Sequence, residues 1–321
     1  MKTAAQHGAA LPEGLELGGY RIVKKIAVGG FSIVYLAHDH EGRPVAIKEY
    51  LPAALVRREP GQLAPAVDAG SVELYRLGMK YFFDEGRALA AIEHPNVVRV
   101  LNFFRAHDTV YLVMRYEQGR SLQEHLTRRR QQQRTPLFSE RAIRAVFLQV
   151  MDALREVHTH KLLHLDLKPA NIYLRDDGTP ILLDFGAARQ TLQADPLQIH
   201  PIYTPGFAAP ELHQKADLGP WTDIYGIGAS ICCCMLGAPP QPALERQKED
   251  VMEKRWPELA SCYSATLVDL VRRSLALDPM ARPQSVYALQ KLMRPAAGRP
   301  QDSQAKEGPA SLLSRLRRAL H

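Results

Sequence analysis

The chain has 321 residues, enough for two packed lobes or two modest domains. Its composition, 46% hydrophobic and 23% charged residues, is that of a globular protein and excludes a disordered one. The net charge of +7 is compatible with many partners, but no basic segment is interleaved with aromatic residues as in RNA-binding motifs, so we expect no nucleic-acid partner.

The N-terminal third has the pattern of a β-sheet. Residues 1–17 are small and contain glycine and proline, so we expect a flexible N-terminal segment. From Tyr20 the stretches YRIVKKIA, SIVYLAHD and VAIKEY predict three consecutive antiparallel strands, separated by turns. Residues 51–70 are rich in proline, alanine and glycine, and they predict a surface insertion.

A helix and two more strands are predicted next. The segment VELYRLGMKYFFDEGRALAAIEH has apolar residues at helical spacing and ends at His94-Pro95. Gly78 and Gly86 weaken the prediction of one rigid helix. The segment VVRVLNFFRAHDTVYLVMRYE predicts two strands, so a sheet-rich N-lobe covers about residues 18–117.

The rest of the chain is mainly helical in pattern. Apolar residues from Ile143 to Val157 recur at offsets 0, 3, 4, 7, 8, 11 and 14, behind Ser139 as the expected N-cap. Helical patterns continue to about Arg294, so a C-lobe covers about residues 118–294. Residues 295–310 have linker composition, and residues 311–321 predict a basic amphipathic helix.

Cysteine usage indicates a reducing compartment. Three of the four cysteines are adjacent, at positions 232–234, and cannot provide the spacing of a zinc site. Their apolar surroundings predict buried thiols. The uncharged run around them, about 14 residues, is shorter than the roughly 20 that span a bilayer. The first residues lack the apolar core of a signal peptide, so we expect a cytoplasmic protein.

The most specific motif is HLDLKPAN, residues 164–171, followed by DFG, which begins at Asp184. Phosphoryl transfer requires a fixed triphosphate, metal ions on its oxygens and an acceptor hydroxyl held in line. Asp166 is the candidate base for that hydroxyl, and Lys168 is placed to stabilise charge on the γ-phosphate. Asn171 and Asp184 offer the oxygen ligands that Mg²⁺ prefers.

These motifs, in this order, resemble those of bacterial eukaryotic-type (Hanks-type) serine/threonine protein kinases over about residues 20–294. The resemblance implies an α+β fold with two lobes: a small antiparallel β-sheet N-lobe with one main helix, and a larger, mostly helical C-lobe. It implies an enzyme that uses ATP and Mg²⁺, with Mn²⁺ as an alternative ion, to phosphorylate serine and threonine hydroxyls of protein substrates and of itself. The segment ending in VAIKEYLP further resembles a bacterial subgroup with a Glu-Tyr-Leu-Pro tail.

The resemblance also assigns the nucleotide site. Lys48 in VAIK resembles the lysine that holds the α- and β-phosphates, and Glu85 is its expected acidic partner. The phosphate loop departs from G-x-G-x-x-G because Ala27 and Ser32 replace glycines, although both are small. Met114 would guard the rear of the adenine pocket. The residues expected at the nucleotide are Ala27, Val28, Gly29, Gly30, Phe31, Ser32, Val34, Ala46, Lys48, Met114, Arg115, Tyr116, Glu117 and Tyr173.

Further residues would support this site without performing chemistry. By resemblance, Thr204 in TPGFAAPE braces Asp166 and Lys168, and Asp223 anchors the catalytic loop from a buried helix. Glu211 is expected to pair with Arg282. Leu89, Val100, His164 and Phe185 fit the regulatory apolar stack of the family.

Leu165 stands where many kinases carry arginine beside the catalytic acid. Since that cation is the partner of a phosphorylated activation loop, we expect the loop at 187–203 to need no phosphate. Thr191 is the only serine or threonine between Asp184 and Thr204.

Two alternatives remain open. A nucleotide-binding scaffold without catalysis is suggested by Ala27, Ser32 and Leu165, and a small-molecule kinase shares the acid–asparagine–acid core. A cognate phosphatase is a further expected partner. The basic segment 127–136 is predicted to be a solvated loop, with partner docking as the alternative. The C-terminal helix could make weak contact with a membrane surface or a partner.

Overall fold

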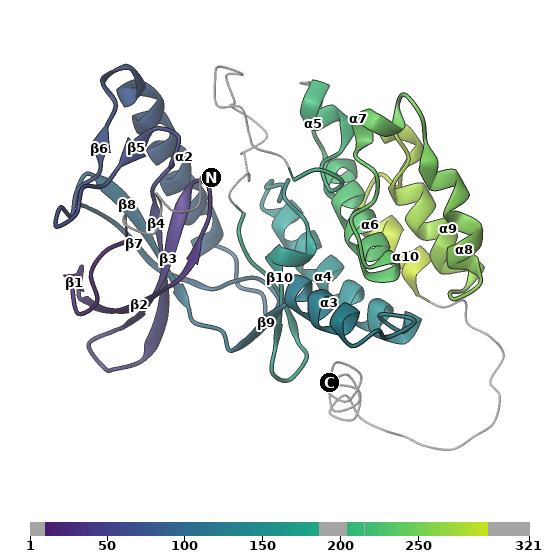
Figure 1. The fold of residues 1–321 in the computed structure, drawn as a ribbon, viewed down its shortest axis with the longest axis horizontal. Coiled ribbons are helices and arrows are strands. Elements are labelled where there is room, and N and C mark those ends of the chain that lie inside the picture. Colours follow the sequence, from purple (N-terminus) through teal and green to yellow (C-terminus); the bar gives the residue numbers. More distant parts are fainter. Residues whose placement is uncertain (1–9, 186–203, 215, 295–321) are drawn as a thin grey trace. The chain divides into compact units, whose positions relative to one another are not determined.

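The computed structural model describes residues 10–185, 204–214 and 216–294. The predictions for the loop around Thr191, for the linker and for the C-terminal helix lie outside these residues. The described chain forms two compact units (Figure 1). The first consists of residues 10–93 and 98–117, and the second consists of residues 94–97 and the described residues from 118 onward.

The first unit is built on a six-stranded antiparallel sheet (Figure 1). Its strand order is β1-β2-β3-β4-β8-β7. The strands are β1 (Glu16–Leu17), β2 (Tyr20–Val28), β3 (Ser32–His38), β4 (Pro44–Tyr50), β7 (Val100–Ala106) and β8 (Thr109–Arg115). The three consecutive antiparallel strands predicted from Tyr20 onward are confirmed.

Strand β4 is the most deeply buried strand of this sheet. Every residue from Val45 to Tyr50 is buried, which requires cover on both faces. Lys48 and Tyr50 lie on the face that packs on helix α2 (Val72–Ala90), where the Tyr50 ring contacts Phe82. Glu49 lies on the opposite face because side chains alternate along a strand.

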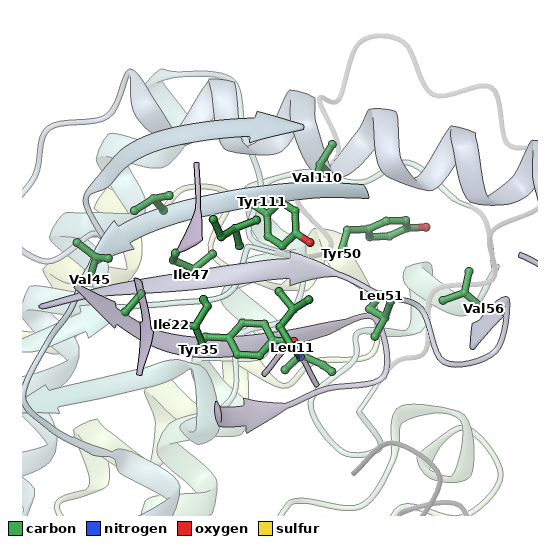
Figure 2. Packing of buried hydrophobic residues seen from close by; sticks show 14 of the residues in the cluster. Leu11, Ile22, Tyr35, Val45, Ile47, Tyr50, Leu51, Val56, Val110 and Tyr111 are labelled. Carbon is green, nitrogen blue, oxygen red and sulfur yellow. The ribbon is translucent and has the colours of Figure 1, made fainter. Parts of the chain in front are cut away.

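The N-terminal residues help to cover the sheet. Leu11 and Leu17 are only 4% and 1% exposed, and the backbone N–H of Leu11 donates to the hydroxyl of Tyr35 at 3.1 Å. Figure 2 shows Leu11 beside Tyr35 in the core. The expectation of a flexible segment through residue 17 is therefore wrong for residues 10–17, because Leu11 and Leu17 are part of the core.

Helix α2 is continuous across both of its glycines. A Cβ at Gly78 would lie 2.0 Å from the Tyr50 hydroxyl oxygen, and one at Gly86 would lie 2.8 Å from Cδ1 of Leu112. The glycines therefore allow close approach of the helix to β4 and β8. The close packing offsets the poor helix propensity of the two glycines.

The predicted insertion at 51–70 is only partly a surface feature. It contains a small two-stranded sheet, β5 (Val56–Arg57) with β6 (Ala66–Val67), and the 3₁₀ turn η1 (Ala69–Ser71) leads into α2. Val56 and Arg58 are 5% and 7% exposed. The segment packs against the six-stranded sheet, which its composition did not indicate.

The second unit is mainly helical, as predicted (Figure 1). Its helices are α3 (Leu122–Gln131), α4 (Glu140–Thr159), α5 (Pro210–Gln214), α6 (Pro220–Leu236), α7 (Ala243–Arg246), α8 (Trp256–Ala260), α9 (Ala265–Ser274) and α10 (Val286–Met293). The 3₁₀ turns are η2 (Pro169–Asn171), η3 (Val251–Lys254) and η4 (Pro279–Ala281), and a small sheet has the strand order β11-β10-β9, with β9 (Gly119–Ser121), β10 (Ile172–Arg175) and β11 (Pro180–Leu182). Among the described helices, none has the length and apolar character needed to cross a membrane.

Helices α4 and α6 form the centre of this unit. The Ser139 side chain accepts a hydrogen bond from the Ala142 N–H, which confirms the predicted N-cap of α4. Almost all of α6 is buried, including Cys232, Cys233 and Cys234. Burial raises the pKa of Cys232 and of Cys233 to about 12, so these thiols are protonated at neutral pH.

The basic segment 127–136 is not simply a solvated loop. Residues 127–131 form the last turns of α3. Arg129 is 6% exposed, its guanidinium carbon lies 4.7 Å from the centroid of the Phe138 ring, and it donates to the Leu137 carbonyl oxygen. The prediction of a solvated loop is therefore wrong at Arg129, which helps to join α3 to α4.

Candidate active site

The loop between α4 and β10 gathers the predicted catalytic side chains of the second unit. The Lys168 ammonium lies 2.7 Å from Oδ2 of Asp166, and the Asn171 amide donates to the same oxygen at 3.0 Å. The Asn171 amide also donates to the Asp166 backbone carbonyl at 2.9 Å. Asp166 is thus fixed at both its backbone and its carboxylate.

Thr204 closes this cluster from a distant part of the sequence. Its hydroxyl accepts a hydrogen bond from Lys168 at 2.9 Å and donates to Oδ1 of Asp166 at 3.4 Å. Oδ1 is therefore the less tightly hydrogen-bonded of the two carboxylate oxygens of Asp166.

Asp184 lies at the end of a chain segment that is tied to the same loop. The Leu183 N–H donates to the Asn171 carbonyl oxygen at 2.9 Å. Asp184 itself is exposed and has φ of 53°, in the left-handed region. Such a conformation is costly for a residue other than glycine, so the local structure must hold it.

Asp223 holds the catalytic loop from α6. Its carboxylate accepts hydrogen bonds from the backbone N–H groups of His164 at 2.9 Å and Leu165 at 2.8 Å. His158 of α4 lies 2.8 Å from the same carboxylate. These bonds hold Leu165 at φ of 60°, a left-handed conformation that is unfavourable for leucine.

The charge state of Asp223 follows from these contacts. Burial alone would raise the pKa of its carboxyl group. The hydrogen bond and charge of His158, followed by the interaction with His164, outweigh burial and hold the pKa below the ordinary value. Asp223 is therefore ionised at neutral pH even though it is 1% exposed.

His164 and Phe185 form an apolar contact beside the catalytic loop. Their ring centroids are 4.5 Å apart, and a ring nitrogen of His164 lies 3.1 Å from the Leu183 carbonyl oxygen. Burial lowers the pKa of His164, which favours the neutral ring. The other predicted members of this stack, Leu89 and Val100, are buried in the first unit.

The predicted Glu211–Arg282 pair is present and buried. The two guanidinium nitrogens lie 2.6 and 3.0 Å from the two carboxylate oxygens. Arg282 also donates to the backbone carbonyls of Trp221 and Ala276. This two-pronged geometry joins α5 to α6 and to the segment before α10.

In the first unit, Lys48 of β4 faces helix α2, which carries Glu85. The Lys48 ammonium lies 5.5 Å from the centroid of the Phe82 ring. Glu85 is three positions further along α2, and residues three apart share one face of a helix. This geometry supports the predicted pairing of Lys48 with Glu85.

Other nucleotide-site candidates of the first unit are neighbours across the sheet. Val34 pairs with both Ala27 and Lys48, and Ala46 pairs with Met114. Gly29, Gly30 and Phe31 form the exposed tip of the β2–β3 hairpin, and Val28 pairs with Ile33 at its base. Arg115 ends β8, and Tyr116 and Glu117 follow it.

Tyr173 is placed in the second unit, on β10. Its hydroxyl donates to the Gly119 carbonyl oxygen at 2.7 Å. Strand β10 also pairs with β9, which begins at Gly119. This bond restricts the orientation of the ring, and its role as a floor for the adenine base stays a prediction.

The donor chemistry of Asn171 and Asp184 fits a magnesium ion. Both provide oxygen ligands, and Mg²⁺ is usually held by few protein carboxylates together with phosphate oxygens and water. In the described part of the chain, no group of three or more His, Cys, Asp or Glu side chains forms a metal cage.

Sequence reasoning missed several supporting residues. His158 carries no motif, and only the three-dimensional structure shows that it contacts Asp223. Glu49 belongs to no catalytic motif, although it is buried beside Arg58 and accepts hydrogen bonds from it. A charged residue within a run of buried strand positions was the signal that could have identified Glu49.

Comparisons with known proteins show which family the chain resembles. The protein kinase domain family matches residues 20–293. The chain is 28% identical over 276 residues to serine/threonine-protein kinase PknA of Nostoc sp., covering 82% of this chain and 44% of that protein. It is 28% identical over 285 residues to serine/threonine-protein kinase D of Synechocystis sp., covering 85% and 51%. The chain spans about half the length of these curated relatives.

Solved structures confirm the predicted fold class. The apo form of PpkA-294 superimposes with a TM-score of 0.77 at 33% identity, covering 89% of this chain and 100% of that chain. The kinase domain of Mycobacterium tuberculosis PknI superimposes with a TM-score of 0.63 at 24% identity, covering 88% and 98%, and shows the fold alone.

Proposed function

Because the chain belongs to the protein kinase family, we propose that it transfers the γ-phosphate of ATP to serine and threonine hydroxyls of protein substrates. The observation that carries this proposal is the hydrogen-bonded cluster of Asp166, Lys168, Asn171 and Thr204. The relatives named serine/threonine-protein kinases support the same substrate class.

Each member of the cluster has a role in the proposed reaction. Asp166 accepts the proton of the acceptor hydroxyl and aims that hydroxyl in line. Lys168 stabilises negative charge near the γ-phosphate, and its hydrogen bond to Asp166 holds the ammonium and the carboxylate side by side. Thr204 and Asn171 restrict the carboxylate, which lowers the cost of orienting it during the reaction.

Members of this family use ATP and a divalent metal ion. We propose Mg²⁺, with Mn²⁺ as a substitute, held by Asn171 and Asp184 because both side chains offer oxygen ligands. When bound, the ion neutralises charge on the phosphate oxygens. Lys48, supported by Glu85, would hold the α- and β-phosphates, and the hairpin tip from Val28 to Ser32 would cover them.

Activation is proposed to proceed without phosphate on the loop that contains Thr191. Leu165 is 7% exposed and apolar, so it offers no cation to a phosphate group. Thr191 lies outside the described residues. The proposed autophosphorylation would therefore accompany activity and not be required for it.

The partners and the location of the protein are also proposed. Protein substrates follow from the family, and a phosphatase that removes the phosphate is expected beside a signalling kinase. Three buried free thiols support the cytoplasmic location, since such thiols persist in a reducing compartment.

The linker at 295–310 and membrane contact by residues 311–321 concern residues outside the described chain. We propose 18–294 as the catalytic domain.

The test is transfer of radiolabelled phosphate from ATP to a basic protein substrate in the presence of Mg²⁺. The wild-type protein should label serine and threonine, and Asp184→Asn should lower transfer by about a thousandfold because a metal ligand is lost. Transfer that persisted in Asp184→Asn would contradict the assignment. Binding of ATP without any transfer by the wild type would favour the scaffold, and transfer to small alcohols alone would favour a small-molecule kinase.

A further inference from the structure

A buried ion pair lies on the face of β4 opposite to Lys48. Glu49 is 0% exposed, and its carboxylate accepts two hydrogen bonds from the guanidinium of Arg58, one of them at 3.1 Å. The hydroxyls of Tyr35 and Tyr111 donate to the same carboxylate at 2.7 and 2.8 Å. The four bonds come from β3, β8 and the 51–70 segment, so the position of Glu49 is strongly restricted.

The phenols and the guanidinium of this network keep their protons. Burial, followed by the charge of Glu49, raises the pKa of both Tyr35 and Tyr111, so both phenols keep the protons that they donate. The hydrogen bond and charge of Glu49 raise the pKa of Arg58 in spite of its burial. An ionised pair without such partners would be costly at this depth.

The same segment is attached to the predicted phosphate loop. The backbone N–H of Leu51 donates to the Phe31 carbonyl oxygen at 2.8 Å, and that of Ala53 donates to the Gly30 carbonyl oxygen at 3.0 Å. Ser32 pairs with Tyr50, so the contact between the loop and the end of β4 is continuous. The exposed tip of the hairpin is therefore supported by residues that follow β4.

We propose that residues 49–58 form a brace that positions the phosphate loop and Lys48 for the nucleotide, with Glu49 and Arg58 as its positioning residues. The brace fixes the strand from which Lys48 projects. It also holds the tip of the loop through hydrogen bonds to the backbone carbonyl oxygens of the tip. This inference rests on the proposed function, because it assigns the brace to an ATP site. The brace also explains how this loop keeps a defined shape although alanine and serine replace two of the usual glycines.

The first test replaces Arg58 with an apolar residue of similar length. Arg58→Met leaves the Glu49 charge buried and unpaired, so the Tm should fall by about 10 °C. The Kd for ATP with Mg²⁺, measured calorimetrically at least about 15 °C below that Tm, should rise about tenfold. A folded Arg58→Met protein with the wild-type Kd would overturn the proposal.

A double variant separates positioning from stability. Glu49→Gln combined with Arg58→Met removes both charges, so the Tm should return to within about 4 °C of the wild type. The Kd for ATP should stay about fivefold weaker, because the two-pronged attachment is still absent. A Kd that recovers together with the Tm would mean that the pair is only structural, and would overturn the proposal.

The matched control is Arg43→Met. Arg43 pairs with Asp39 at 2.8 Å in the turn before β4, but its side chain is 63% exposed. Exposed pairs of this kind contribute little to stability, so this variant should keep the wild-type Kd and Tm.

Hydrogen exchange gives a readout that needs neither nucleotide nor catalysis. In the double variant, or in Glu49→Gln if the double variant does not fold, amides of residues 51–58 and of residues 28–33 should both exchange about tenfold faster. Faster exchange in 51–58 with unchanged exchange in 28–33 would overturn the brace. Failure of the wild type to transfer phosphate would instead contradict the proposed function. The hydrogen-exchange comparison would still test the brace, because it does not depend on activity.

Discussion

At the scale of single residues, Asp223 connects a buried helix to the catalytic loop. Its carboxylate accepts the N–H groups of His164 and Leu165, and through them it holds Leu165 in a left-handed conformation. The loop that carries Asp166 therefore depends on a carboxylate that touches no substrate. Asp223 is a positioning residue in this sense.

Asp223→Asn should weaken both the fold and the reaction. The amide cannot accept both backbone N–H groups and face His158 as a carboxylate does, so the free energy of unfolding should fall by about 3 kcal/mol. The kcat should fall about thirtyfold with a smaller change in the KM for ATP, because Asp166 is less well oriented. Urea unfolding and steady-state kinetics measure the two effects.

The same substitution at the exposed Asp217, six residues earlier, is the control and should change neither quantity. An Asp223→Asn variant with wild-type kcat would contradict the positioning role.

The lowered pKa of Asp223 predicts how its contribution depends on pH. A carboxyl group whose pKa is lowered in the folded state stabilises the fold above its unfolded pKa, for which 3.8 is the ordinary value, and loses that contribution as the pH falls through the folded value. The difference in unfolding free energy between wild type and Asp223→Asn should therefore shrink as the pH falls below about 3.8. A difference that grew at low pH would contradict this assignment.

Single residues were predictable where a motif fixes their spacing. Asp166, Lys168 and Asn171 are separated by two and three positions, and the structure places them in one hydrogen-bonded cluster. His158 and Arg58 could not be predicted, because the partner of each, Asp223 and Glu49 respectively, lies on another element of the fold. Long-range contacts of this kind leave no local pattern.

At the scale of elements, helix α2 is set against the sheet by its glycines. Gly78→Ala would normally stabilise a helix by about 1 kcal/mol, but here the added methyl group meets the Tyr50 hydroxyl. The Tyr50 ring is confined by Tyr75 and Phe82, so it cannot move away cheaply. We expect Gly78→Ala to destabilise the protein by about 2 kcal/mol.

Thermal unfolding measures this effect, and Gly70→Ala is the control because a Cβ there meets no atom within 4 Å. A Gly78→Ala protein that is more stable than the wild type would show that the packing against Tyr50 is looser than described.

Elements were predicted well where their hydrophobic period is strong, and poorly where packing decides. The amphipathic pattern behind Ser139 gives α4 with its expected cap. By contrast, the 51–70 segment and the basic end of α3 were predicted from composition alone. Arg58 and Arg129 are buried by specific partners, Glu49 and the Phe138 ring, which composition does not reveal.

At the scale of the whole molecule, the four cysteines report on cooperative unfolding. Cys232, Cys233 and Cys234 are buried in α6, whereas Cys262 is exposed. A maleimide reagent should modify only Cys262 in the native protein. The other three should react only at urea concentrations where the second unit unfolds, because their burial and raised pKa suppress the reactive thiolate.

Mass spectrometry of the labelled protein counts the modified thiols. Rapid labelling of any α6 cysteine without denaturant would contradict the buried position of this helix.

The fold class of the whole chain was predictable because two kinds of signal agreed. Strand patterns precede helical ones, and the catalytic motifs occur in the chain order of the protein kinase family. The packing of residues 10–17 on the sheet was not predictable, since a short segment with few apolar residues resembles a loose terminus.

The most direct test of the account compares wild type with Asp166→Asn at saturating ATP and Mg²⁺. Because Asp166 orients and deprotonates the acceptor hydroxyl, the variant should transfer phosphate to serine and threonine about a thousandfold more slowly, while its Kd for ATP stays within about threefold of the wild type. Equal rates of transfer by the two proteins would contradict the assignment of Asp166 as the catalytic base and, with it, the proposed reaction.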